Sequence, residues 1–389
     1  MGRFSLLAAG ILLTALNLRI AVASVPPLLS DLERDLGMSS TVAGVLTSLP
    51  VLCFGTVAFA APSVVRRAGG ELALVGVLAA IVAGVLLRAA GSTAALFAGM
   101  AVAGAGMAIG NVVVPAVIKS SFPRSIGLMM GLYTAVLNAS AALGGGLAVP
   151  FEHALGWQGS LAIWATPAAV AGAVMVAAAR RGHHDAAIRG GAGEMRTLFR
   201  DRLAWQVTLF FAIQSGIFYS GLSWLPSILK ADGFSAGTAG ALLSVYALCG
   251  VPTALVAPAL ATRARTQGHL VAAAIALDIA ALLGLLLAPG VAPLWVTLFG
   301  FGQGAAFALA LTLIVLRSPD PRRGAELSGM TQAVGYCIAA AGPVAVGAVH
   351  DLAGDWRAAL ILLVALCAPL FVLGAAAGRD RVVSPGAAP

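Results

Sequence analysis

The residues best suited to chemistry in this chain lie inside an apolar segment. Residues 15–27 read ALNLRIAVASVPP, in which Asn17 and Arg19 stand two positions apart. An arginine at membrane depth costs about 2.5–3.5 kcal/mol on insertion scales, and its guanidinium stays protonated in proteins. Arg19 therefore needs a carboxylate, a set of backbone carbonyls, or an anionic solute in a water-filled cavity. The residue types favour the solute.

Asp278 is the acidic residue nearest the centre of an apolar run, and it offers Arg19 an alternative partner. An intramembrane carboxyl group can pair with a cation or carry a proton. It can also serve only as a hydrogen-bonding group between packed helices. The sequence leaves the proton role and the structural pair with Arg19 open.

Amide and phenol side chains accompany Arg19 inside the apolar runs. Together they would give a small solute a polar, uncharged lining, although each amide could equally serve only to join neighbouring helices. Trp224, near the end of its run, could be an interfacial anchor or a lid. With Arg19 and Trp224, the predicted solute-binding residues are Asn17, Asn111, Tyr133, Asn138, Gln214, Tyr219, Gln303, Gln332 and Tyr336.

The elements that must position these side chains follow from composition. The chain has 389 residues, is 60% hydrophobic and only 10% charged, and has a mean hydropathy of +0.98. A soluble domain carries roughly 25% charged residues, whereas a membrane-spanning helix needs about 20 apolar residues in a row. We therefore predict an all-α polytopic membrane protein with twelve spans, near 4–29, 41–62, 71–90, 94–118, 125–149, 159–179, 204–229, 238–262, 268–288, 293–317, 324–349 and 356–378.

The net charge of +8 does not indicate nucleic-acid binding, because the charges fall on one side of the predicted spans. With a cytoplasmic N-terminus, 18 Lys and Arg residues lie on the cytoplasmic side and 4 outside, and Arg19 completes the 23. Such an excess marks the inner side. We expect a multi-pass protein of the inner membrane with both termini in the cytoplasm, partnered by the bilayer and a small solute. We expect it to act as a monomer.

The chain divides into two similar halves. A shift of 198 residues places Lys119 on Arg317, Pro123 on Pro321 and Gly131 on Gly329. Two six-helix repeats in the same order predict halves related by an axis along the membrane normal, with a solute site near the midplane between them. The predicted domains are residues 1–179, a cytoplasmic linker at 180–203, residues 204–378 and a tail at 379–389.

Sequence patterns of enzymes and metal sites are missing. The chain contains no His-Glu-x-x-His, no Gly-x-Ser-x-Gly and no Gly-x-x-x-x-Gly-Lys, and its histidines lack metal-ligand spacing. We expect no catalytic residue, cofactor or metal, so that transport would be driven by gradients. Arg66 and Arg67 fall in the predicted turn between the second and third spans, where we expect them to affect conformation. We read the N-terminal segment as a retained first helix.

Seven stretches resemble one family in particular. They are LNLRIAVASVPPLL (16–29), LTSLPVLCFG (46–55), GAGMAIGNVVVPAVIKSSFPR (104–124), GLMMGLYTAVLNASAALG (127–144), QSGIFYSGLSWLPSIL (214–229), GQGAAFALALTLIVLRS (302–318) and LSGMTQAVGYCIAAAGP (327–343). The chain resembles the major facilitator superfamily, and within it the cyanate permease and 2-nitroimidazole transporter branch. Members of that branch usually have Asn-x-Arg-Pro on the first span; Asn17 and Arg19 match, while Ile20 replaces the proline. The resemblance implies that Arg19 binds the solute.

These observations predict a secondary active transporter for a small polar or anionic solute, cyanate-like or nitroimidazole-like, that works by alternating access. One alternative is a proton-driven drug exporter, for which Asp278 would be the candidate carboxylate. A membrane receptor without transport activity, or an embedded enzyme, is the alternative from another class. Solute flux in liposomes distinguishes these classes.

Overall fold

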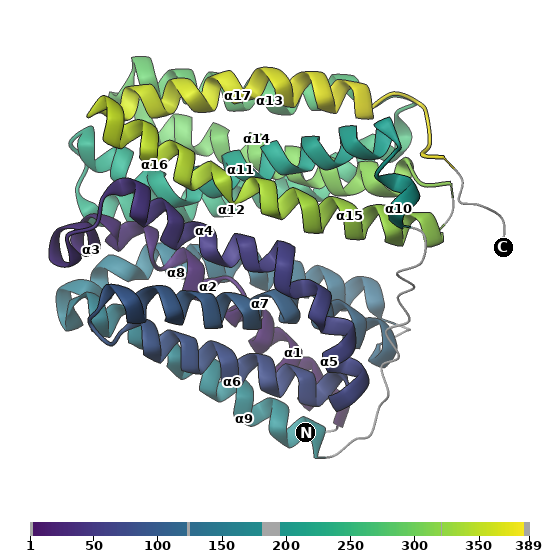
Figure 1. Ribbon diagram of the computed structural model, residues 1–389, viewed down its shortest axis with the longest axis horizontal. Coiled ribbons are helices and arrows are strands. Elements are labelled where there is room, and N and C mark those ends of the chain that lie inside the picture. Colours follow the sequence, from purple (N-terminus) through teal and green to yellow (C-terminus); the bar gives the residue numbers. More distant parts are fainter. Residues whose placement is uncertain (1–2, 123–124, 181–194, 320, 385–389) are drawn as a thin grey trace. The chain divides into compact units, whose positions relative to one another are not determined.

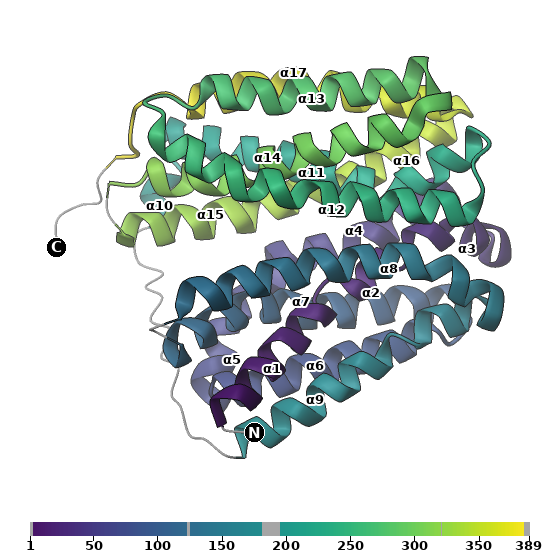
Figure 2. The same ribbon diagram turned by 180° about the vertical axis from the view of Figure 1, so that it is seen from behind.

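A computed structural model describes residues 3–122, 125–180, 195–319 and 321–384 of the chain. Regular structure throughout these residues is helical, and no strand occurs among them (Figures 1 and 2). The predicted all-α class is thereby confirmed. Helices are what the composition demands, because a segment crossing lipid must satisfy its backbone hydrogen bonds internally.

Helices follow one another closely in the first part of the chain, and several are interrupted by short 3-10 turns or glycines. The elements are α1 (Arg3–Asn17), α2 (Ile20–Ala23), η1 (Pro26–Leu28), α3 (Leu29–Leu36), α4 (Ser40–Thr56), η2 (Val57–Ala60), α5 (Ala61–Ala68), α6 (Gly70–Arg88), α7 (Thr93–Ser121), α8 (Ile126–Ala162) and α9 (Ala165–Ala179). Inside α8 the backbone leaves the helical region at Gly156 (φ 69°, ψ 170°). The fifth and sixth predicted spans therefore meet at this glycine, which takes a positive φ at little cost.

The second part of the chain contains longer uninterrupted helices. They are α10 (Met195–Leu198), α11 (Arg202–Ala231), α12 (Ala236–Arg263), α13 (Gly268–Leu287), η3 (Pro289–Val291), α14 (Ala292–Leu316), α15 (Pro321–Ala339), α16 (Ala341–Ala353) and α17 (Trp356–Ala377). The eleventh predicted span corresponds to α15 followed by α16, and the twelfth to α17.

By length and composition, nine helical segments of the described chain could cross a membrane, or ten if the bent pair 135–162 and 165–179 counts as one span. The 30-residue helix α11 is not among them. It carries Gln214, Ser215, Ser220 and Ser223, and all four are buried. A helix enclosed by other helices does not need an apolar surface on every side, which explains its lower hydropathy.

Contacts divide the chain into two compact units, whose bounds differ from the predicted halves. The first unit comprises residues 1–38, 49–190 and 236–244, and the second comprises 39–48, 191–235 and 245–389. The beginnings of α4 and α12 thus each belong to the unit formed mainly by the other half. In the second unit, the Asp351 carboxylate of α16 accepts hydrogen bonds from the backbone N–H groups of Ser40 and Thr41, at 3.1 and 2.7 Å.

Small residues let the helices of the first unit approach closely. Helix α6 packs against α7 and α9 and lies beside both in Figures 1 and 2. A Cβ atom at Gly84 or at Gly99 would collide with the backbone of the facing helix. Glycine at such contacts permits backbone-to-backbone packing, which drives helix association where lipid gives no hydrophobic force.

The second unit is built around α11, which packs against α14, α15, α16 and α17, while α13 lies between α14 and α17. Helices α13 and α17 run side by side in both views (Figures 1 and 2). Phe210 and Phe211 of α11 are fully buried in this unit. Gln214 and Ser215 follow on the same helix and are buried as well.

The basic pair Arg66 and Arg67 lies in the last turn of α5. The chain reverses at Gly69 (φ 79°), which directly follows the helix. The reversal thus falls at a glycine within the predicted turn, because glycine adopts this φ most easily. The side chain of Arg67 is exposed, and that of Arg66 lies outside the described part of the chain. Their effect on conformation stays a prediction.

Candidate functional site

The first predicted span is broken at Arg19. Helix α1 ends at Asn17, and α2 begins at Ile20, with Arg19 as its N-cap at φ −132° and ψ −25°. The Arg19 carbonyl then accepts hydrogen bonds from the N–H groups of Val22 and Ala23. The break thus occurs although Ile20, and not proline, follows the arginine. It leaves Arg19 half-buried within a membrane-spanning segment.

Arg88 supports the segment that follows the break. Because the Val25 N–H bonds to Val22 in a tighter turn, the Ala21 carbonyl lacks its usual helical donor. The guanidinium of Arg88, which is fully buried at the end of α6, donates to this carbonyl. It also donates to the Ser24 hydroxyl at 3.3 Å and to the Leu161 carbonyl at 3.2 Å.

Sequence reasoning missed Arg88, because it lies near the outer end of the predicted span 71–90 and was counted among the charges outside the membrane. One signal was available. The run at 70–88 contains small residues along its length, which indicates close packing by neighbouring helices and leaves a terminal arginine little access to water.

Glycine on α8 allows the broken segment to lie against that helix. A Cβ atom at Gly144 would lie 2.5 Å from the Ile20 carbonyl oxygen and 3.2 Å from the backbone nitrogen of Ser24. Any larger residue would therefore push α2 away from α8. Gly144 thus admits the bent segment beside α8, and Arg88 bonds to that segment. Together they fix the part of the chain that follows Arg19.

Uncharged polar side chains accompany Arg19 in the first unit. The Tyr133 hydroxyl donates to Asn111 Oδ1 at 3.3 Å, and Arg19 is close enough to interact electrostatically with Tyr133. No described carboxylate of the first unit lies within 4.0 Å of the Arg19 guanidinium. Asn17 is fully buried; its amide donates to the Leu13 carbonyl at 2.8 Å, and its Oδ1 has no partner among the described residues. Asn17 thus holds an unused acceptor two residues from an unpaired cation.

In the second unit, four polar side chains form a buried hydrogen-bonded chain across three helices. The Ser215 hydroxyl donates to Gln214 Oε1 at 3.2 Å, and Gln214 Nε2 donates to Gln303 Oε1 at 3.1 Å. Gln303 Nε2 then donates to Asp278 Oδ2 at 2.9 Å. Two predicted lining residues are therefore bonded to each other, and the predicted carboxyl group ends their chain.

Aromatic side chains form a second group in this unit. Tyr336 makes edge-on ring contacts with Phe211 at 5.0 Å and with Tyr219 at 6.4 Å between ring centroids. Tyr219 is buried and Tyr336 half-buried. Gln332 is exposed and donates to Ser328 at 2.8 Å. Tyr219 and Tyr336 therefore contact each other. The hydrogen bond of Gln332 goes instead to its helix neighbour Ser328.

Trp224 is enclosed by side chains of the second unit. Its side chain is fully buried, its indole N–H donates to the Pro343 carbonyl at 2.8 Å, and its ring lies 5.1 Å from that of Trp356. Such burial argues against an anchor that faces lipid, and the two predicted roles of Trp224, anchor or lid, stay predictions. A buried tryptophan needs an acceptor for its indole N–H. Here the acceptor is the Pro343 carbonyl, near the start of α16.

The described beginning of the predicted tail at 379–389 packs onto the second unit. Val383 is fully buried, and its N–H donates to the Arg317 carbonyl at 2.8 Å. The N–H and hydroxyl of Ser384 donate to the Asp201 carboxylate at 2.7 and 2.8 Å. Partial burial acts to raise the pKa of Asp201, but the hydrogen bonds from Ser384 and from the first N–H groups of α11 outweigh it and lower the pKa.

The predicted site residues thus fall into separate groups. Arg19, Asn17, Asn111 and Tyr133 lie in the first unit; Gln214, Gln303, Asp278, Tyr219 and Tyr336 lie in the second. Within each unit, members of the group are linked by hydrogen bonds or ring contacts. The side chain of Asn138 lies outside the described part of the chain. Whether Arg19 and Asp278 form a pair stays a prediction.

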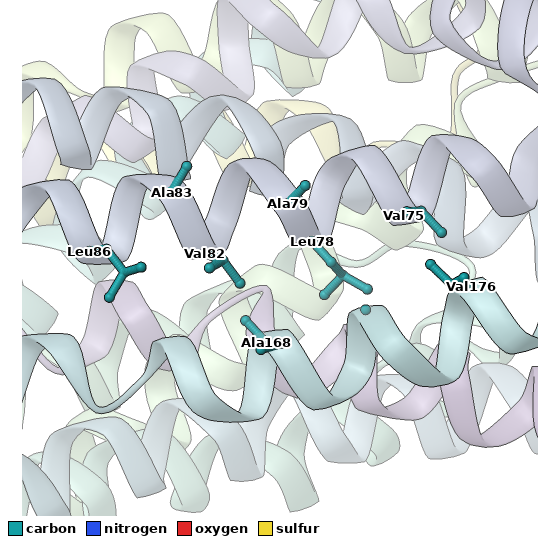
Figure 3. A pocket seen from close by; sticks show the side chains of 10 residues that line it. Val75, Leu78, Ala79, Val82, Ala83, Leu86, Ala168 and Val176 are labelled. Carbon is teal, nitrogen blue, oxygen red and sulfur yellow. The ribbon is translucent and has the colours of Figure 1, made fainter.

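A groove of about 460 Å³ lies along α6 and α9 in the first unit. In Figure 3 Leu78, Val82 and Leu86 of α6 face Ala168 and Val176 of α9 across it. All ten lining residues are apolar or glycine. A solute that needs directional polar contacts finds none here, so the candidate site remains the polar group around Arg19.

Comparisons with known proteins agree with these features. A model of the Major Facilitator Superfamily matches residues 7–325. A 2-nitroimidazole transporter of Escherichia coli (strain K12) is 36% identical over 378 residues, which cover 97% of this chain and 96% of that protein. The cyanate transport protein CynX of the same organism is 31% identical over 350 residues, covering 89% of this chain and 90% of that protein.

Among solved structures, a bacterial homologue of the human lysosomal transporter Spinster, in an inward-facing and unoccupied conformation, matches with a TM-score of 0.78. The match covers 98% of this chain and 99% of that one at 16% sequence identity, so it concerns the fold alone. Both the sequence resemblance and the predicted fold are confirmed. With its membrane-spanning helices, its buried polar groups and these matches, the chain belongs to the Major Facilitator Superfamily of membrane transporters.

Proposed function

We propose that the protein is a secondary transporter that carries a small polar or anionic solute across the inner membrane by alternating access, and that Arg19 binds the solute. The observation that carries this proposal is an arginine at a helix break within a membrane-spanning segment, with no described carboxylate of its own unit within ion-pair distance. A permanent cation in such a place needs an anionic partner or water.

The neighbouring groups support a small solute with directional contacts. Arg19 offers a planar set of donors, which can hold two acceptor atoms at once. The hydroxyl of Tyr133 and the amide of Asn111 lie in the same unit. The relatives described as carrying 2-nitroimidazole and cyanate fit this chemistry, because a nitro group and cyanate both present compact, partly or fully negative acceptors. The excess of Lys and Arg on the side of the predicted spans that carries both termini favours a cytoplasmic location for those termini.

The test uses purified protein with potassium cyanate and 2-nitroimidazole as probes. Binding should raise the melting temperature in a concentration-dependent manner, and proteoliposomes should show counterflow of the bound probe. Arg19→Lys should weaken binding by about 1–3 kcal/mol, the range for hydrogen bonds to charged groups, which is roughly a 5- to 150-fold rise in Kd. Arg19→Ala should abolish counterflow while the protein still folds.

Arg34→Ala is the matched control, because Arg34 lies further along the same segment with a side chain that is 70% exposed. It should leave binding and counterflow unchanged. The pairing alternative predicts that Arg19→Ala destabilises the protein and that Arg19→Ala with Asp278→Ala restores its melting temperature. Such a rescue, with probe affinity preserved, would refute the role proposed for Arg19.

A further inference from the structure

Asp278 is an acid that the solute site does not use. It lies on α13, is fully buried, and has one hydrogen-bonded oxygen, Oδ2, which accepts from Gln303. Among the described residues its other oxygen, Oδ1, has no partner. A carboxyl group in a membrane interior with a single amide donor is far from satisfied in its charged form.

The surroundings of Asp278 provide no cation. Tyr246 of α12 and Cys367 of α17 are the titratable side chains that interact with it electrostatically. From α14 it receives the neutral amide of Gln303, and the apolar η3 adds no titratable group. No lysine or arginine of the described chain contributes to the electrostatics of its carboxyl group.

The fold keeps a place for this carboxyl group. A Cβ atom at Gly302, on the facing helix α14, would collide with Asp278 Oδ1. Glycine at this position therefore makes room for the unpartnered oxygen. A buried acid that served no purpose could be replaced by an apolar residue at little cost, because unsatisfied polar groups only destabilise a core.

A proton suits this place better than a metal cation. The described residues contain no group of three or more His, Cys, Asp or Glu side chains that could hold a metal ion. Gln303 turns its amide nitrogen, a donor, toward the carboxyl group, and its oxygen faces Gln214. A donor at the site repels a metal ion, whereas a proton on Asp278 removes the cost of the buried charge.

The hydrogen-bonded chain connects the state of this carboxyl group to α11. An amide has one donor end and one acceptor end, so the chain through Gln303 and Gln214 can run in two directions. When Asp278 offers an acceptor, both amide nitrogens point toward it, as observed. When a protonated Asp278 offers its O–H to Gln303, both amides reverse and Ser215 becomes an acceptor. Gln214 Nε2 then gives up the 3.4 Å bond that it also donates to the Gln303 backbone carbonyl.

We propose that Asp278 is the coupling-proton site of this transporter and that Gln303 and Gln214 report its protonation to α11. The carboxylate takes up one proton from the water on one side of the membrane to become the neutral acid. It releases that proton to the other side when the transporter changes state. This inference rests on the proposed transport function, and it adds the energy source.

The first experiment needs no solute. Infrared difference spectra of the full-length protein in liposomes, recorded between acidic and alkaline pH, should contain the carbonyl stretch of a protonated carboxyl group that shifts in D₂O. Asp278→Asn should lack this band. Tyr246→Phe and Cys367→Ala are the matched controls, because they remove the two titratable neighbours, and both should keep the band.

The second experiment measures transport of potassium cyanate and 2-nitroimidazole. In the wild type, a pH gradient should drive accumulation of up to about tenfold per pH unit if one proton accompanies each solute, since one pH unit is 1.36 kcal/mol. Asp278→Asn should keep counterflow and lose the accumulation. Gln303→Leu should keep the infrared band and lose the accumulation, because the acid remains while its link to α11 is broken.

The outcomes separate this inference from the proposed function. An Asp278→Asn protein whose infrared spectrum equals that of the wild type, or that still accumulates solute in a pH gradient, overturns the proton site. A band that does not change between acidic and alkaline pH also overturns it, because the proton would not exchange. Absence of counterflow in the wild type with either probe counts against the proposed function, while the spectra still decide whether Asp278 holds an exchangeable proton.

Discussion

The buried Arg88 should be a main support of the broken first span, and its removal should cost stability. Its guanidinium makes hydrogen bonds to the Ala21 and Leu161 carbonyls and to the Ser24 hydroxyl. Taken singly, three hydrogen bonds to a charged group at about 1.5–3 kcal/mol each would sum to more than the net effect, because burying the guanidinium itself carries a desolvation cost.

The expected loss follows from the groups that Arg88 leaves behind. In Arg88→Met the aliphatic volume is largely kept, and the Leu161 carbonyl loses its side-chain donor while Ala21 retains the Ser24 hydroxyl at 3.1 Å. An unsatisfied buried group costs about 1–3 kcal/mol, so we expect a loss of about 1–3 kcal/mol, which comes mainly from the Leu161 carbonyl. For a unit of this size that corresponds to a fall in melting temperature on the order of 3–9 °C.

Thermal unfolding in one detergent measures this effect, with Arg34→Ala as the control because its side chain is 70% exposed. Arg88→Lys should lie between the wild type and Arg88→Met, since one ammonium cannot reach all three acceptors. Arg88→Met should also weaken probe binding, because the segment that orients Arg19 loses its anchor. An Arg88→Met protein that melts within about 2 °C of the wild type would refute this account of the break.

Two further predictions concern close packing and the C-terminal segment. Gly144→Ala should lower both melting temperature and probe affinity, because its Cβ would lie 2.5 Å from the Ile20 carbonyl oxygen; Gly76→Ala, with nothing within 4 Å of its Cβ, should do neither. The pKa of Asp201 is lowered in the folded protein, so its contribution to stability is present above its unfolded pKa of about 3.9 and is lost as pH falls through the lower folded value. Asp201→Asn, which keeps a good helix N-cap, should therefore melt with a weaker dependence on acid pH than the wild type; identical pH profiles would contradict this.

The sequence alone determined the class of fold, because lipid leaves a chain few options. Long apolar runs can cross a membrane only as helices that satisfy their own hydrogen bonds, so composition predicts both helices and spans. Arg19 and Asp278 were also visible, since a charge in an apolar run is costly enough to require a purpose. Each of these two residues can be recognised from the apolar run around it, without knowing which side chains contact it in the fold.

What surrounds these two residues was decided by tertiary structure. The break at Arg19 occurs without proline, because Arg88 satisfies the Ala21 carbonyl and Gly144 admits the bent segment, and both lie far from Arg19 in the chain. Likewise Gln303 reads as a solute contact in sequence but is bonded to Asp278 in the fold. An amide or arginine can meet many partners, and only the packing of distant helices selects one.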